Sequence, residues 1–144
     1  MIIMYKNLTG RVFQAHFVAE ENIWTDEQCQ EWNIANPGNT ARVVPDLKHA
    51  TGCYYNETTE QLEDAFNFSI SASKNTILDN GTDYAEFSNI PEGTRVNIDE
   101  NYIGDVDSSG IFQFTSTEVG QYWIQFEKYG HLEHVEGVKV NAEI

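Results

Sequence analysis

Hydrophobic and polar residues alternate with a period of two through much of the chain's second half. The clearest run is Gln121–Glu127, where Tyr122, Ile124 and Phe126 share one side and Trp123, Gln125 and Glu127 share the other. Clusters of Gly, Pro, Asn and Asp separate this run from its neighbours. A period of two broken by turn-forming residues predicts short antiparallel strands joined by tight turns.

The same pattern predicts seven strands after residue 66. Turns are expected at Asp99–Asn101 and Asp107–Gly110. Seven short strands in about 75 residues fit a small β-sandwich better than a helical fold. The expected strands are Phe68–Ala72, Tyr84–Phe87, Arg95–Ile98, Tyr102–Val106, Ile111–Thr115, Gln121–Glu127 and Val135–Val140.

Three motifs in this half resemble immunoglobulin-like domains. Glu118–Ile124, with the sequence EVGQYWI, resembles the acidic-x-Gly-x-Tyr-x-Cys signature, with Ile124 where antibody domains keep a cysteine. Ser71–Ala85 resembles the opening of bacterial Ig-like modules, and Pro91–Thr94 with the strand after it resembles the PEGA type of small sandwich. The resemblance implies an Ig-like antiparallel β-sandwich over 67–144, in which the Tyr122 hydroxyl bonds back to upstream backbone. It implies no reaction.

The first half predicts a small N-terminal α+β module over 1–66, rich in β-structure with one short helix. Thr25 and Gln28 have capping-box spacing, so a helix of about two turns is expected to reach Trp32. Gln61–Phe66 fits a strand or a helix, and a strand is favoured weakly. The irregular period of Arg11–Val18 indicates a bulge or a strand buried on both faces. The other expected strands are Ile2–Tyr5, Ala41–Val44 and Cys53–Tyr55, and Pro45–Gly52 is expected to be a loop.

The layout of the first half also resembles a phage module. It resembles the N-terminal module of hypothetical proteins in tailed-bacteriophage gene clusters. The elements that carry the resemblance are, in order, a short strand, a Gly turn, Arg11-Val12-Phe13, a loop containing Asp, Tyr54-Tyr55 and a polar turn. Such proteins often continue into a single Ig-like module. The resemblance implies a virion component of the tail, tail fibre or capsid surface, made in the host cytoplasm. It implies other virion proteins as partners, a homo-oligomer within the particle and docking by 1–66, and it leaves contact with the host surface open.

The composition excludes several function classes. The 144 residues contain 23 Asp and Glu against 8 Lys and Arg, a net charge of −15, which opposes binding to nucleic acid or to an anionic membrane. The sequence contains no run of about 18 apolar residues, so no membrane span is predicted. Met1–Tyr5 is too short for a signal peptide. Cys29 and Cys53 do not form a CxxC motif, so they are expected to be free thiols, with a disulfide as the alternative.

Two stretches carry candidate metal ligands, and each has a simpler structural interpretation. His131 and His134 lie near Glu133 and Glu136, in a bend before a strand, with no third ligand at an obvious spacing. Asp105-x-Asp107-x-Ser109-Gly110 matches the first half of a calcium loop. The bidentate Glu is missing, because Ser116 occupies its place. A bend and a hairpin turn are therefore favoured, and no metal or cofactor is expected.

No catalytic constellation is visible. His16 and His49 have no Ser or Cys motif beside them. The acidic pairs Glu20-Glu21 and Glu63-Asp64 are adjacent residues, which face opposite ways on a strand. Trp24 and Trp32 are expected to pack in the core, with a partner contact as the alternative.

The sequence therefore predicts no catalytic, cofactor-binding or metal-binding residue. The function it favours is a non-enzymatic structural or interaction component of a tailed-phage particle. The alternatives are an adhesion or carbohydrate-binding module and, less favoured, a small hydrolase or metal enzyme.

Overall fold

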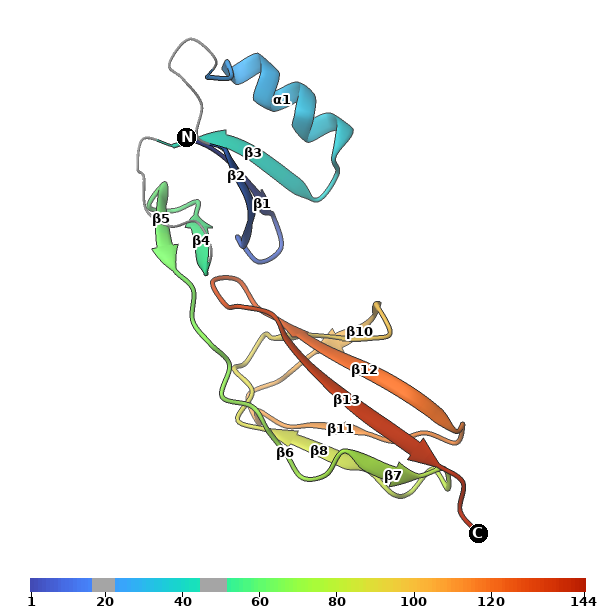
Figure 1. Cartoon of the computed structure of the whole chain (residues 1–144). Coiled ribbons are helices and arrows are strands. Elements are labelled where there is room, and N and C mark those ends of the chain that lie inside the picture. Colours follow the sequence, from blue (N-terminus) through green and yellow to red (C-terminus); the bar gives the residue numbers. More distant parts are fainter. Residues whose placement is uncertain (17–22, 45–51) are drawn as a thin grey trace. The chain divides into compact units, whose positions relative to one another are not determined.

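The computed structural model describes residues 1–16, 23–44 and 52–144 (Figure 1). The chain divides into two compact units: unit 1 comprises Met1–Phe66 with Tyr129–Leu132, and unit 2 comprises Asn67–Lys128 with Glu133–Ile144. The fold is mainly β, as predicted, with one helix in the part described. The sequence did not indicate that Tyr129–Leu132 belongs to unit 1.

Unit 1 consists of a three-stranded antiparallel sheet, one helix and a hairpin (Figure 1). The order in the sheet is β2-β1-β3, and α1 packs against β3. The expected strand at Gln61–Phe66 is confirmed over Gln61–Asp64, because these residues pair with the preceding strand. The elements are β1 (Ile2–Lys6), β2 (Val12–His16), α1 (Asp26–Ala35), β3 (Asn39–Val43), β4 (Cys53–Asn56) and β5 (Gln61–Asp64).

The helix begins as the sequence predicts and ends later. Gln28 N donates to Thr25 Oγ1 (3.2 Å) and Thr25 N donates to Gln28 Oε1 (2.8 Å), which completes the capping box. The helix continues past Trp32 to Ala35, so the predicted end was wrong. Asn36 ends it, where the side-chain Nδ2 donates to the Trp32 carbonyl (2.8 Å).

The irregular period of the second strand is explained by a bulge. Pairing between β1 and β2 shifts register between Met4, which faces Gln14, and Tyr5, which faces Val12. The expected loop at Pro45–Gly52, except Gly52 itself, and the end of the expected strand at Phe17–Val18 lie outside the described residues.

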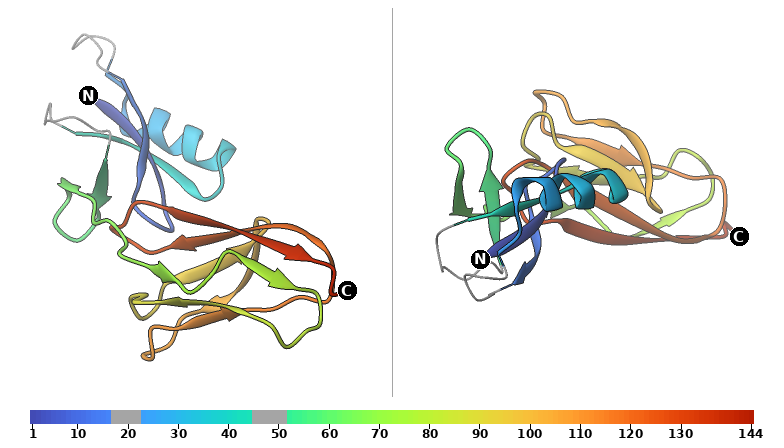
Figure 2. Two further views of the ribbon diagram at one scale, coloured as in Figure 1. Left: turned by 60° about the horizontal axis from the view of Figure 1, so that its bottom comes forward. Right: turned by 90° about the horizontal axis from the view of Figure 1, so that it is seen from above.

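Unit 2 is a two-layer sandwich (Figure 2). One sheet has the order β10-β9-β12-β13-β7 and the other the order β11-β8-β6. Chain neighbours such as β8 and β9, or β11 and β12, lie in different sheets, so the chain crosses between the two layers, as it does in Ig-like sandwiches. The strands are β6 (Ser71–Ala72), β7 (Thr76–Leu78), β8 (Ala85–Ser88), β9 (Arg95–Ile98), β10 (Asn101–Asp105), β11 (Phe112–Phe114), β12 (Gly120–Glu127) and β13 (His134–Asn141).

Two strand predictions in unit 2 need correction. Thr76–Leu78 was not expected to be a strand, yet it pairs with β13, and it does so in parallel, whereas the other strand pairs are antiparallel. The predicted strand Phe68–Ala72 is reduced to Ser71–Ala72.

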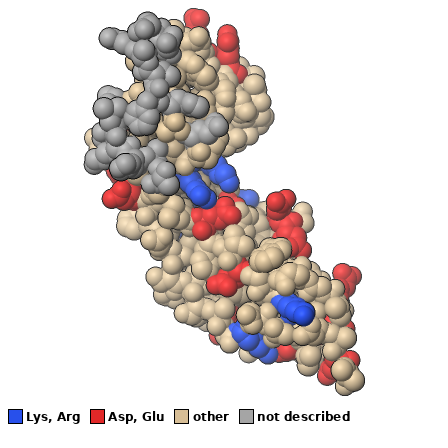
Figure 3. Space-filling view, in the orientation of Figure 1, with Lys and Arg blue, Asp and Glu red and all other residues tan. Residues whose placement is uncertain are grey.

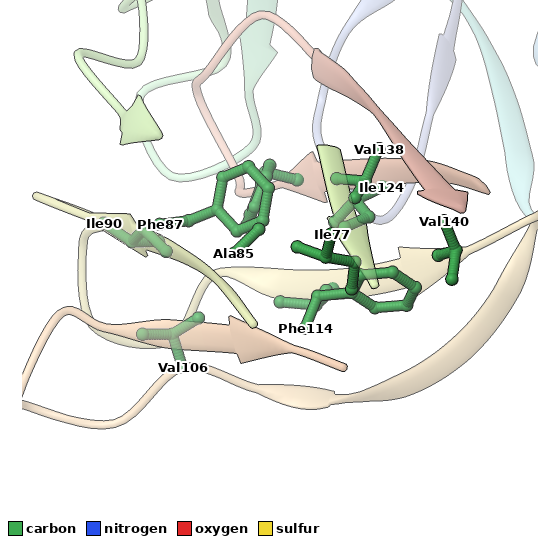
Figure 4. Close-up of a cluster of buried hydrophobic side chains, with 11 residues drawn as sticks. Ile77, Ala85, Phe87, Ile90, Val106, Phe114, Ile124, Val138 and Val140 are labelled. Carbon is green, nitrogen blue, oxygen red and sulfur yellow. The ribbon is translucent and has the colours of Figure 1, made fainter. Parts of the chain in front are cut away.

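The core of unit 2 is one continuous cluster between the two sheets (Figure 4). The predicted alternation in β12 is confirmed: Ile124 and Phe126, which share a side, are fully buried, and Tyr122 packs against the same cluster. Ile124, which the motif resemblance aligns with a cysteine, is thus a core residue of the sandwich. The buried members are Ile77, Ala85, Phe87, Ile90, Val96, Val106, Phe114, Ile124, Phe126, Val138 and Val140.

The expected tyrosine corner is present. The Tyr122 hydroxyl donates to the Glu118 carbonyl (3.0 Å) and lies 3.2 Å from Ser116 Oγ. This bond ties the connection between β11 and β12 to the start of β12, as in other Ig-like sandwiches.

Candidate functional site

The outer face of the five-stranded sheet carries the most unusual exposed side chain of unit 2. Residues of β12 that alternate with the core positions point to this face, and Trp123 among them is 56% exposed. A tryptophan that the core does not use is a feature of binding surfaces, where Trp is enriched.

The Trp123 indole is held against the sheet by a glycine on the neighbouring strand. Trp123 pairs with Gly137 of β13. A Cβ at Gly137 would lie 2.8 Å from Cζ3 of Trp123 and 3.0 Å from Nε2 of Gln121, closer than atoms normally approach. Only a glycine therefore leaves room for the ring in this position.

A hollow of about 440 Å³ lies beside the indole. We call it the Trp123 hollow. Three of its six lining residues are acidic and none is basic. The lining residues are Asp99, Glu100, Trp123, Gln125, Glu133 and Val135.

The turn between β9 and β10 fixes one wall of the hollow. Asp99 and Glu100 have φ values of 47° and 69°, and Ile98 pairs with Asn101, so these two residues form a tight hairpin turn of the I′ kind. The Asp99 carboxylate is anchored to β12, because Trp123 N donates to Asp99 Oδ1 (2.9 Å) and Asp99 N donates to the Trp123 carbonyl (2.9 Å). The acidic turn is thus hydrogen-bonded to the backbone of the residue that carries the indole.

A polar group lies next to the hollow on the same sheet. Asn97 and Glu127 are polar, yet they are only 7% and 8% exposed. Asn97 Nδ2 donates to Glu127 Oε1 (2.9 Å) and to Gln125 Oε1 (3.1 Å), so these side chains cover one another. Gln125 belongs to both groups, and its amide orientation is therefore fixed at the edge of the hollow.

Arg95 and Tyr102 lie beside this polar group on the neighbouring strands, because Arg95 pairs with Glu127 and Tyr102 pairs with Asn97. The Arg95 guanidinium carbon lies 3.9 Å from the centre of the Tyr102 ring. The Tyr102 hydroxyl donates to Asp105 Oδ1 (2.9 Å), and this hydrogen bond raises the pKa of the tyrosine.

The candidate zinc ligands of the segment 131–136 form no metal site in the described part of the chain. His134 Nε2 lies 2.8 Å from Glu136 Oε1, whereas His131 belongs to unit 1. Within residues 1–16, 23–44 and 52–144, no three His, Cys, Asp or Glu residues are grouped as metal ligands.

The half calcium loop is engaged in turn hydrogen bonds. Asp107 Oδ1 accepts from Ser109 N (2.9 Å) and Ser109 Oγ (2.5 Å), and these bonds lower the pKa of Asp107. Gly110 follows with φ of 69°, which a glycine adopts without strain. This geometry is that of a turn.

The acidic pair at Glu63 and Asp64 also serves local structure. Glu63 Oε2 accepts from the Tyr54 hydroxyl (2.7 Å) and from Asn56 Nδ2 (3.1 Å), and both bonds lower the pKa of Glu63. Cys53 Sγ lies 3.8 Å from Asp64 Oδ1. Glu20, Glu21 and His49, which the sequence did not favour as catalytic residues, lie outside the described residues, as does the side chain of His16.

The tryptophans and cysteines of unit 1 occupy structural positions. Trp24 and Trp32 pack against the cluster of Ile2, Met4, Cys29 and Ala41. Cys29 and Cys53 are buried and do not form a disulfide, and burial raises the pKa of Cys29.

The Trp123 hollow was missed by the sequence analysis. The available signal was Trp123 itself, a large aromatic residue on the polar side of an alternating strand. Its pairing with Gly137 depends on strand register, which no local pattern supplied.

Acidic side chains recur across the face of the molecule in Figure 3, with basic side chains in a few places. This agrees with the net charge of −15. No helix in the described part of the chain is long and apolar enough to cross a membrane.

Comparisons with known proteins give little further information. No protein-family model matches the chain, and no curated protein does. A solved structure of a C-terminal 282-residue fragment of intimin, in complex with the intimin-binding domain of the translocated intimin receptor, is similar over 50% of this chain. The identity is 19% and the TM-score 0.34, and the similarity spans 32% of that fragment. A similarity of this size says nothing about what the present chain binds.

Proposed function

We propose that this chain is a non-enzymatic interaction protein that binds a partner through the Trp123 hollow on the Ig-like unit. The observation that carries the proposal is the exposed indole of Trp123, held over Gly137 at the edge of a concave surface. The core of unit 2 is continuous without this residue. Its position is therefore explained better by binding than by folding.

The biological setting in this proposal is a tailed-phage particle. The resemblance of residues 1–66 to modules from phage gene clusters supports it, and so does the combination of that module with one Ig-like unit. In this setting unit 1 docks on other tail, fibre or capsid proteins and unit 2 contacts a partner. The protein is made in the host cytoplasm and acts in the virion, where particle symmetry favours several copies.

Quantitative mass spectrometry of purified particles tests this setting. The genome that encodes the chain is propagated, and particles are purified by density gradient. The proposal expects the chain in the particle fraction at a fixed ratio to the major capsid protein. Recovery of the whole pool as a free monomer outside the particles would contradict it.

A second candidate function is carbohydrate binding or adhesion. The specific observation in its favour is the same exposed Trp123 ring, because aromatic faces also stack on sugar rings. Loss of glycan-array binding in Trp123→Ala, with retained binding in Val119→Ala, would support this candidate. Val119 is 59% exposed and does not line the hollow, so it serves as the matched control.

A further inference from the structure

We infer that the Trp123 hollow accepts a cationic side chain, Lys or Arg, presented by a basic segment of a partner protein. This inference rests on the proposed function and deepens it by naming the chemistry of the partner. It would place the cation against the indole face, with carboxylates around it.

The first support is the charge of the lining. Asp99, Glu100 and Glu133 supply three acidic groups, and no Lys or Arg lines the hollow. Asp99 is fixed by its hydrogen bond from Trp123 N, so one carboxylate is preorganised before any partner arrives. A fixed carboxylate loses little conformational freedom on binding.

The second support is the neighbouring aromatic surface. A cation within about 6 Å of a tryptophan ring centre is attracted to the ring face, and Trp is the strongest such partner among the aromatic residues. The same sheet already shows this contact once, with the Arg95 guanidinium 3.9 Å from the centre of the Tyr102 ring. An incoming cation at Trp123 would find the ring and the carboxylates in one concave surface.

The third support is the overall charge, which decides between a basic protein segment and a neutral glycan. With a net charge of −15, the protein attracts a basic partner at long range and gains no such attraction for an uncharged sugar. The carboxylates of the hollow would accept hydrogen bonds from either ligand, but only the cation benefits from their charge.

Nuclear magnetic resonance titration of the full chain tests the inference. The ¹⁵N-labelled protein is titrated with Nα-acetyl-arginine methylamide, with the neutral probe Nα-acetyl-norleucine methylamide and with the neutral oligosaccharide cellotetraose. The Trp123 indole N–H signal is assigned by its loss in Trp123→Phe. We expect the arginine probe to shift this signal and the backbone amides of Asp99, Glu100 and Glu133 at probe concentrations where norleucine and cellotetraose do not.

Matched charge variants separate a local site from general attraction. Glu100→Gln with Glu133→Gln removes two charges from the hollow, whereas Glu118→Gln with Glu143→Gln removes two exposed charges elsewhere. The first pair is expected to weaken arginine binding about threefold or more and the second pair to change it little, at an ionic strength of about 0.15 M. Urea unfolding of both double variants controls for folding.

The outcomes distinguish this inference from the proposed function. Equal shifts by norleucine, shifts by cellotetraose alone, equal weakening in both double variants, or no shift by the arginine probe would each overturn the inference. If Trp123→Ala still abolishes binding to particles assembled without the chain, the proposed function stands while the cationic assignment falls. If Trp123→Ala leaves partner binding unchanged, the proposed function itself falls.

Discussion

The two units bury their hydrophobic residues in different ways. Unit 2 encloses one cluster between two sheets, so each strand has an inner and an outer face. Unit 1 has one three-stranded sheet that is buried on both faces, with Ile3 and Tyr5 in one cluster and Ile2 and Met4 in another. The burial pattern of β1 is accordingly continuous, and it does not alternate. The comparison shows that the core of the sandwich leaves the outer face of its larger sheet unused, whereas both faces of the small sheet are buried.

Unit 1 also depends on a segment from far along the chain. The Tyr129 hydroxyl donates to the Tyr55 carbonyl (2.7 Å) and accepts from Glu57 N (3.0 Å). Gly130 N donates to the Thr9 carbonyl (2.9 Å), and Phe66 N donates to the Gly130 carbonyl (2.8 Å). Unit 1, whose hydrophobic residues form two small clusters, thus gains hydrogen bonds from Tyr129–Leu132. Unit 2 has a single core and needs no such segment.

The largest expected effect is on the core of unit 2. Phe126 is fully buried, and its ring centre lies 5.5 Å from that of Phe87. Phe126→Ala is expected to lower the free energy of unfolding of unit 2 by about 3–5 kcal/mol. Hydrogen exchange of peptides from β8 and β12, read by mass spectrometry, measures it, with Val119→Ala as the surface control. Unchanged protection in those peptides would contradict the single-core description.

The next effect concerns pH and unit 1. Burial, and then the hydrogen bond to Glu57 Oε1 (2.9 Å), raise the pKa of Tyr5 from 10.0 to about 12. The neutral phenol is favoured in the folded state, so its contribution is complete below pH 10 and is lost as the pH rises through about 12. Its size is on the order of 2 kcal/mol.

Urea unfolding followed by Trp24 and Trp32 fluorescence, in a Trp123→Phe background, measures the first part of this loss, about half of it, between pH 9 and pH 11. The Tyr5→Phe variant removes the titrating group and is expected to lose less stability between these two values. An equal pH dependence in the variant would assign the loss to other groups, among them Tyr54 and Tyr55, whose pKa values are also raised.

A smaller effect is expected where Tyr129 joins unit 1. Tyr129→Phe removes the hydroxyl shared by Tyr55 and Glu57 and is expected to destabilise unit 1 by about 1 kcal/mol. The change from Tyr to Phe at Tyr84, which is 45% exposed, is the control and is expected to have no measurable effect. If the two variants are equally stable in the fluorescence assay, the Tyr129 hydroxyl adds nothing to the stability of unit 1.

The smallest expected effect in this comparison is on the exposed indole. Gly137→Ala would place a methyl group against the Trp123 ring and shift it. Unit 2 is expected to keep its stability to within about 1 kcal/mol, because the ring lies outside the core and an exposed side chain can move. Binding is expected to fall, since the ring leaves its position beside the hollow. A loss of folding in this variant would assign a structural role to the Trp123–Gly137 pair.

The parts of the fold that depend on local pattern were predicted from sequence. The Thr25–Gln28 capping box, the alternation in Gln121–Glu127 and the Tyr122 corner each need only residues close in the chain. Thr76–Leu78 was missed because three residues with one buried side chain, Ile77, carry little periodicity and become a strand only by pairing with the distant β13.

The site was beyond local pattern for the same physical reason. Trp123 meets Gly137 through strand register, and the low exposure of Asn97 and Glu127 results from cross-strand hydrogen bonds. The residues of the hollow can be read from the sequence, but the strand register that brings them together cannot be predicted from it.

The most direct test of the central claim compares Trp123→Ala with wild type in two assays on the same samples. One assay measures the unfolding of unit 2 by hydrogen exchange, and the other measures binding to particles assembled without the chain. We expect stability within about 1 kcal/mol of wild type and a loss of binding, whereas Val119→Ala retains both. Retained binding in Trp123→Ala, or unfolding of the sandwich, would contradict the claim that this face of the sheet serves recognition.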